Sequence, residues 1–168
     1  EILLFYFYFI NNMVTRKERI FKLRNNIDKE WSQYYFKFIE DNQDKKWYWY
    51  CISQNPNITM EIINDNPIKH WNWSMISYNP NITMDIINDN PIKHWSWMGI
   101  SQNTNITIKM IRDNPMQKWD WFNISFNPNI TMDFIRDNPD KPWKWNYISM
   151  NPNITMDMIQ NNPDKPWD

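Results

Sequence analysis

The stretch NPNITMEIINDNPIKHWNWSMISY, residues 55–78, decides the fold, because close copies of the same 24 residues follow it without a gap. The next copies are NPNITMDIINDNPIKHWSWMGISQ at 79–102, NTNITIKMIRDNPMQKWDWFNISF at 103–126 and NPNITMDFIRDNPDKPWKWNYISM at 127–150. Residues 151–168, NPNITMDMIQNNPDKPWD, continue the pattern. A period that never slips is the mark of a repeat array, in which each unit buries its apolar face only against its neighbours.

Tryptophan recurs at the same position in each 24-residue unit, and we call the position of a residue within its unit its phase. Counted from Trp47, residues 47–168 hold five tandem 24-residue units and the start of a sixth. The first tryptophan of each unit is Trp47, Trp71, Trp95, Trp119, Trp143 or Trp167, and the second is Trp49, Trp73, Trp97, Trp121 or Trp145. Isoleucine, serine and asparagine recur at fixed phases as well, for example at Ile76, Ser77 and Asn79. Positions that stay constant indicate what stacking between units requires.

The first helix of a unit is expected to begin just after Thr59. Threonine is a favourable N-cap, and the negative charge of Glu61 in the first turn suits the helix dipole. The helix should stop at Asn66-Pro67, since the residue before a proline avoids the helical region. The recurring Asn-Ile-Thr also matches a glycosylation acceptor. Its presence in every unit favours capping and local hydrogen bonding over a sugar on every repeat.

The second helix is expected to begin near Lys69 or Trp71 and to end before Asn79. On this helix Trp73 is expected in the core beside Ile76, whereas Trp71 falls on the side that varies between copies. Helices this short do not persist alone in water, so stacking must stabilise them. A strand interpretation fails because proline interrupts every alternating segment. The sequence therefore predicts an all-α fold, an α-solenoid of tandem 24-residue two-helix repeats.

Two segments precede the array. Residues 1–12 open with an apolar run that is too short to cross a bilayer, which takes ~20 residues, so no membrane span is expected. We interpret them as an apolar leader, a fragment's edge or upstream read-through, since Met13 opens a more polar stretch. Residues 13–46 echo the end of a unit around Phe38 and are expected to be a degenerate N-terminal capping unit.

The composition sets limits on partners and compartment. With 18 basic and 19 acidic side chains the formal charge is -1, so the chain has no global field to hold a nucleic acid. The mean hydropathy of -0.79 is that of a soluble chain. The single cysteine, Cys51, has no partner for an internal disulfide and favours a reducing compartment, which predicts a cytoplasmic location.

The 24-residue period, the Asn-Pro punctuation, the threonine after it and the two aliphatic positions of the next helix resemble the leucine-rich variant repeat over residues 51–166. That resemblance implies a superhelix in which an α-helix alternates with a shorter, often 3₁₀, helix. The family's iron–sulfur cysteine cluster has no counterpart beyond Cys51, so its cofactor is not carried over. The Trp-rich units also resemble repeat proteins of large amoebal DNA viruses, which would make the compartment the host cytoplasm.

Residues that suggest catalysis or metal binding are few. Gly99 is the sole glycine, so neither a P-loop nor a dinucleotide-binding turn is available. His70 and His94 share a phase, which would place them about 8–10 Å apart on stacked helices. That separation is too long for one metal ion, whose His ligands lie roughly 2 Å away. The repeated aspartate at Asp65 and its equivalents is expected to hydrogen-bond at a helix end. We therefore expect no enzyme activity, no metal and no cofactor.

Positions that vary between copies are free to specialise, and they fall at two phases of the second helix. The residues predicted to bind a partner are Tyr50, Tyr78, Met98, Phe122, Phe126, Asn146 and Met150. Repeat proteins use extended surfaces of this kind, so the leading hypothesis is a non-catalytic scaffold for protein–protein interaction with a partner of unknown identity.

Two alternatives come from other classes of protein. The first is a structural role in which the C-terminal edge of the array, near Asp168, pairs with a second chain. The second and weaker alternative is stacking of single-stranded nucleic acid on the aromatic side chains. The missing positive charge argues against it.

Overall fold

The computed structural model describes residues 16–168, and in this part of the chain the regular secondary structure consists of helices joined by turns, with no strand. The chain divides into two compact units, Glu1–Lys46 and Trp47–Asp168. The interpretation of residues 1–12 concerns a segment that lies outside the described residues. The predicted fold class is confirmed, because the second unit is a helical repeat solenoid.

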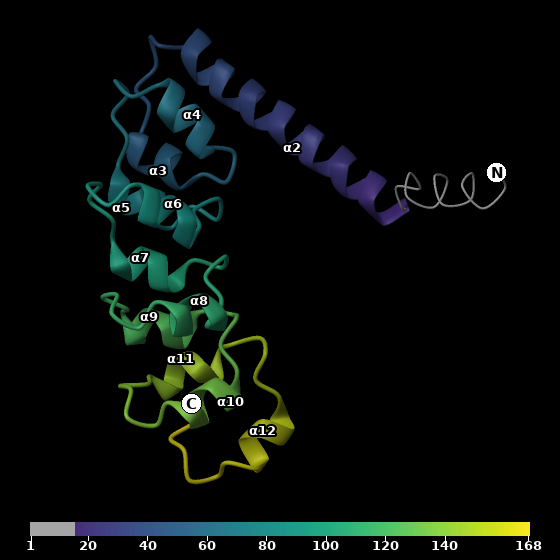
Figure 1. Cartoon of the computed structure of the whole chain (residues 1–168), viewed down its shortest axis with the longest axis vertical. Coiled ribbons are helices and arrows are strands. Elements are labelled where there is room, and N and C mark those ends of the chain that lie inside the picture. Colours follow the sequence, from purple (N-terminus) through teal and green to yellow (C-terminus); the bar gives the residue numbers. More distant parts are fainter. Residues whose placement is uncertain (1–15) are drawn as a thin grey trace, which may run out of the picture. The chain divides into compact units, whose positions relative to one another are not determined.

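The described part of the first unit is dominated by one helix, α2 (Arg16–Asp41), which runs for 26 residues (Figure 1). No proline interrupts the sequence between residues 16 and 46, so nothing breaks the helix into the two short pieces of a repeat unit. The helix buries Ser32, Phe36 and Ile39. That residues 13–46 act as a cap for the array stays a prediction.

Ten short helices build the second unit, and they alternate between two rows (Figure 1). One row consists of α3 (Trp49–Gln54), α5 (Trp73–Ile76), α7 (Trp97–Gln102), α9 (Trp121–Phe126) and α11 (Trp145–Ser149). The other consists of α4 (Met60–Asp65), α6 (Met84–Asp89), α8 (Ile108–Asp113), α10 (Met132–Asp137) and α12 (Met156–Gln160). Direct contacts join α3 to α5, α7 to α9 and α9 to α11, so the first row stacks along the array.

The helices of the second row begin and end as the sequence predicts. The hydroxyl of Thr59 accepts a hydrogen bond from the backbone N–H of Ile62 at 3.3 Å, and threonine caps α6, α8, α10 and α12 in the same way. At the other end, the side chain of Asn66 donates to the carbonyl of Ile62 at 2.9 Å. From the sequence, Asp65 was expected to make the hydrogen bond at the helix end. In the structure this bond comes from Asn66 instead.

The helices of the first row start later than expected. α5 begins at Trp73 and not at Lys69 or Trp71, because the side chain of Asn72 caps it by accepting from the N–H of Met75 at 3.0 Å. Ser96 and Asp120 cap α7 and α9 at the same phase. All five helices of this row are α-helical, so the 3₁₀ character implied by the family resemblance is not found in them.

The most deeply buried isoleucines of the array form a double column, to which the second-row helices add Ile63, Ile87, Ile111 and Ile135, each 3–4% exposed. One column comes from the Asn-Ile-Thr turns and the other from the first-row helices. Ile58, Ile82, Ile106 and Ile130 form the first, and Ile76, Ile100, Ile124 and Ile148 form the second. None of the eight is more than 1% exposed. Trp73, which was expected beside Ile76 in the core, is only half-buried and lies at the rim.

Candidate interaction surface

A ladder of buried asparagines joins the units. Asn127 donates its side-chain amide to the carbonyls of Ser101 and Asn103, both at 3.0 Å, and its side-chain oxygen accepts from the N–H of Asn129 at 2.9 Å. The equivalent bonds recur at Asn79, Asn103 and Asn151. Buried backbone carbonyls are costly unless they are paired. The first asparagine of the Asn-Pro-Asn-Ile-Thr signature is therefore constant for a structural reason.

The second asparagine of the signature is also used between units. Asn129 donates to the carbonyls of Thr104 at 2.6 Å and Ile106 at 2.9 Å in the preceding unit. Asn81, Asn105 and Asn153 donate across the same boundary. A glycan would occupy the very amide nitrogen that makes these bonds, which supports the hydrogen-bonding interpretation of Asn-Ile-Thr.

The constant serine and the paired tryptophans complete the contacts between units. Ser125 donates to the carbonyl of Trp121 at 2.8 Å and accepts from the N–H of Lys144, in the next unit, at 3.0 Å. The indole N–H of Trp143 donates to the carbonyl of Asn138 at 2.8 Å. The ring of Trp143 meets that of Trp121 edge-on, with centroids 5.1 Å apart.

This tryptophan arrangement repeats in every unit. The other edge-on pairs are Trp49–Trp71, Trp73–Trp95, Trp97–Trp119 and Trp145–Trp167, with centroids 4.8–5.1 Å apart. Lysines cover several of the same rings: Lys93 lies 4.6 Å above the centroid of Trp73, and Lys141 lies 4.9 Å above that of Trp121. The tryptophans of these pairs are thus packing elements, and Trp71, Trp95, Trp119, Trp143 and Trp167 already donate their N–H groups to backbone carbonyls.

What remains accessible on the first-row helices is the set of varying positions. Tyr50 is 55% exposed, Met98 53% and Phe122 45%, and Phe126, Asn146 and Met150 are exposed as well. Because their helices stack in one row, these side chains follow one another along the array. Of the seven residues predicted from the sequence, six therefore lie on the surface.

Tyr78 is the exception, since it is half-buried and packs across the next unit. A methyl group added to Gly99 would lie 2.8 Å from a ring carbon of Tyr78, so the ring fits only because position 99 has no side chain. Burial raises the pKa of the Tyr78 hydroxyl, and the charges of Tyr50 and Asp120 raise it further. Tyr78 belongs to the packing of the array as much as to its surface.

The structure brings two of the predicted residues together through a third that the sequence reasoning missed. The ring of Tyr147 lies edge-on to Phe122, with centroids 4.6 Å apart, and to Phe126, with centroids 5.7 Å apart. We call Phe122, Phe126 and Tyr147 the aromatic cluster. Tyr147 shares its phase with Gly99 and Asn123, so variation at that phase was the signal that pointed to it.

Two further exposed apolar rows were missed. On α2 the exposed residues Ile20, Leu23, Ile27, Trp31, Tyr34 and Phe38 follow one another at intervals of three or four. That spacing places them on one face of a helix and is readable from the sequence. At the turns of the array, Ile68, Ile92 and Met116 are almost fully exposed.

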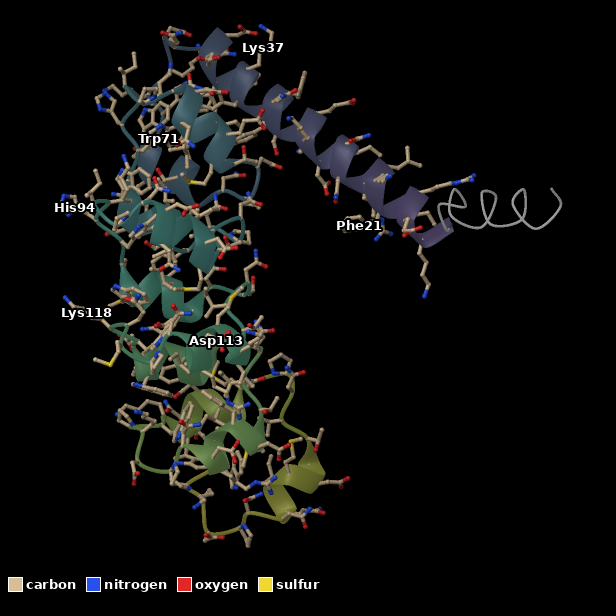
Figure 2. The ribbon with its side chains drawn as sticks, in the orientation of Figure 1. Phe21, Lys37, Trp71, His94, Asp113 and Lys118 are labelled. Atoms are coloured by element: carbon tan, nitrogen blue, oxygen red, sulfur yellow. The ribbon has the colours of Figure 1, made fainter. Side chains whose placement is uncertain are left out.

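The residues considered for metal or acid–base chemistry are dispersed. His94 and Lys118 lie along one edge of the array, whereas Asp113 lies away from that edge at the end of α8 (Figure 2). Asp113 pairs with Lys109, and Asp137 pairs with Arg112 at 2.9 Å. Within residues 16–168, no three His, Cys, Asp or Glu side chains gather closely enough to hold a metal ion. Over the same range, no helix has the length and apolar character needed to span a bilayer.

Comparison with known proteins adds no further constraint. No protein family, curated protein or solved structure matches the chain. The resemblances to the leucine-rich variant repeat and to amoebal virus repeat proteins stay predictions, and a proposal for function has to rest on the surface itself.

Proposed function

We propose that the chain is a non-catalytic repeat scaffold that binds a protein partner in the cytoplasm through the exposed face of α3, α5, α7, α9 and α11. The observation that carries the proposal is the aromatic cluster, three large rings held against one another across two units at a surface. Rigid aromatic groups at a partly exposed site are the usual anchors of protein interfaces.

The constant positions support this proposal by elimination. The asparagine, serine and tryptophan of every unit are engaged in bonds between or within units. Phe122 and Phe126, by contrast, are exposed although they are large and apolar. Apolar area of this kind contributes to binding when a partner covers it.

The proposal can be tested by comparing the unmodified chain with a Phe122→Ser, Phe126→Ser double variant in quantitative affinity capture. The matched control is Met116→Ser, which removes an apolar side chain that is 93% exposed at a turn. The partner should be retained by the control and weakened by about 2 kcal/mol or more on the double variant. Equal capture by both variants, with unchanged helical circular dichroism, would refute the proposed surface.

A structural role is the alternative that a specific observation favours. In the last unit Met156 is 66% exposed, whereas Met132, at the same phase one unit earlier, is 4% exposed. α12 buries none of its residues. A second copy of the chain that covered this face would therefore bury apolar surface.

Sedimentation at increasing protein concentration distinguishes the two roles. If the face around Met156 mediates self-association, Met156→Lys should leave the chain monomeric, while the Phe122→Ser, Phe126→Ser variant should still associate. If the scaffold proposal holds alone, the unmodified chain sediments as a monomer throughout. Binding of single-stranded nucleic acid would instead show an affinity that falls steeply with added salt.

A further inference from the structure

A cavity of about 370 Å³ lies between the fourth and fifth units, away from the aromatic cluster. This volume is within the range of sites for small ligands. Met132 and Ile135 of α10 supply apolar walls, and Trp143 and Trp145 supply aromatic ones. Three cationic side chains, Arg136, Lys141 and Lys165, also line the cavity, and none of its lining residues carries a carboxylate.

The array itself shows what fits a site of this kind. One unit earlier, the ring of Phe134 is 2% exposed and stacks on Trp121, with centroids 6.4 Å apart and planes 19° apart. Trp143 meets the same ring edge-on at 6.0 Å. The guanidinium of Arg112 lies 5.4 Å above the ring centroid. An aromatic ring is thus packed against two tryptophans and a cation.

Two of the equivalent residues one unit later, 24 positions along the sequence, lie at the cavity. Trp145 and Arg136 occupy the phases of Trp121 and Arg112, and both line the cavity. Met158 occupies the phase of Phe134, but it is not among the lining residues and is only half-buried. The cavity therefore retains the tryptophan and the arginine of the earlier site but lacks the ring that packs against them.

We propose that this cavity binds an aromatic carboxylate. The ring takes the place that Phe134 holds one unit earlier, and the carboxylate lies toward Arg136, Lys141 and Lys165. Stacking on tryptophan and charge-assisted hydrogen bonds both favour such a ligand. A free aromatic acid and the C-terminal aromatic residue of a peptide share this chemistry.

The cationic side chains that line the cavity can pair with a further carboxylate. Arg136 pairs with Asp133, and Lys165 pairs with Asp164 at 3.7 Å. Arg136 and both aspartates are largely exposed and Lys165 is 42% exposed, so water screens these pairs and a ligand carboxylate can compete with them. Lys141 lies over the ring of Trp121, which stabilises its position without neutralising its charge.

The first experiment titrates the full chain with N-acetylphenylalanine, its neutral amide, and N-acetylleucine, measured by calorimetry and by the indole N–H signals of the tryptophans. The acid is expected to bind saturably, to shift the Trp145 signal, and to bind about tenfold more tightly than the amide, because the amide lacks the charge. The leucine derivative, which has no ring, should bind more weakly than the phenylalanine acid. Equal binding of acid and amide, or no saturable binding of the acid, would overturn the proposal.

Two matched pairs of variants locate the site. Met158→Phe supplies the chain's own ring and should abolish binding of the acid, whereas Met116→Phe makes the same change at an exposed turn and should leave binding unchanged. Arg136→Gln should weaken binding about tenfold, and Arg112→Gln, at the occupied site one unit earlier, should not. Binding that survives both Met158→Phe and Arg136→Gln would place the acid elsewhere and overturn the assignment. The arginine pair decides the matter if Met158→Phe disturbs folding.

The source of the ligand is distinguished with short peptides. A peptide that ends in phenylalanine with a free carboxylate is compared with the same peptide amidated at its end. Tighter binding of the free-ended peptide than of N-acetylphenylalanine assigns the site to a peptide terminus. If N-acetylphenylalanine binds and the free-ended peptide does not, the site is assigned to a small molecule. Failure of both free acids to bind would overturn the proposal without affecting the scaffold proposal, since the aromatic cluster contributes no residue to this cavity.

Discussion

The turn side and the helix side of each repeat unit use their residues in opposite ways. On the turn side, Asn127 and its equivalents are buried and hydrogen-bonded to the preceding unit. On the helix side, Phe122 and its equivalents are exposed and change from unit to unit. The contrast shows that the bonds to backbone carbonyls on the turn side, which add to the packing of the isoleucine core, require asparagine, whereas the outer helix face accepts many side chains.

The largest expected effect follows from breaking the turn side. Asn127→Ala removes the donor to the carbonyls of Ser101 and Asn103 and the acceptor for the N–H of Asn129. Buried groups left without partners should lower the free energy of unfolding by about 2–4 kcal/mol. Urea denaturation followed by circular dichroism measures this loss.

The control for this prediction makes the same substitution on the helix side. Asn146 is exposed on α11, so Asn146→Ala should change the free energy of unfolding by no more than about 0.5 kcal/mol. A similar loss at Asn127 and Asn146 would show that the two sides do not differ in the way described.

A smaller effect is expected within the helix side, at Gly99 of α7. Alanine is ordinarily better than glycine inside a helix, but a methyl group here would lie 2.8 Å from the ring of Tyr78 and 2.9 Å from Cβ of Ser77. The clash should make Gly99→Ala destabilising by about 1–3 kcal/mol. In a Tyr78→Ser background the cost should fall, as a double-mutant cycle would show. Asn123→Ala, at the equivalent position one unit later, serves as the control.

The next effect concerns the helix start that the sequence reasoning misplaced. Asp120 accepts from the N–H of Asn123 at 3.0 Å and so caps α9. Asp120→Ala should cost about 1 kcal/mol, as loss of an N-cap usually does. Asp120→Asn keeps a capping oxygen and should cost clearly less. Equal losses in thermal denaturation of the two variants would mean that the charge matters and the cap does not.

How far the sequence predicts the structure depends on the kind of interaction. The threonine caps and proline stops act within a few residues, so the second-row helices were predicted correctly. The start of the first-row helices was wrong because Trp71 looked like a helical residue. The better signal was the phase of Asn72, Ser96 and Asp120, all of which are good N-caps.

Features that depend on packing between units were harder to predict. The asparagine ladder satisfies carbonyls of the preceding unit, and which carbonyls lie within reach depends on the rise of the stack. The aromatic cluster was predicted only in part, because Tyr147 comes from the neighbouring helix. The cavity beside Trp145 depends on how side chains of neighbouring units fill the space between them, which a repeat pattern does not convey.

The smallest expected effect is a pH dependence carried by Tyr78. Burial, and then the charges of Tyr50 and Asp120, raise the pKa of its hydroxyl above the ordinary value of 10.0. A raised pKa means that the folded chain keeps the proton after the unfolded chain has lost it. The contribution to stability is therefore fully present below the unfolded pKa and is lost as the pH rises through the folded one.

Two variants separate the causes of this alkaline loss. Tyr78→Phe removes the titrating hydroxyl, so the free energy of unfolding should fall less steeply above about pH 10 than in the unmodified chain. Asp120→Asn keeps the cap and removes one of the two charges, so the phenol of Tyr78 should titrate at a lower pH in an absorbance titration. The shift should be partial, because burial is the largest cause and is unchanged. If Asp120→Asn leaves that titration where it was, the carboxylate does not act on Tyr78, and the link between the cap of α9 and the ring over Gly99 is lost.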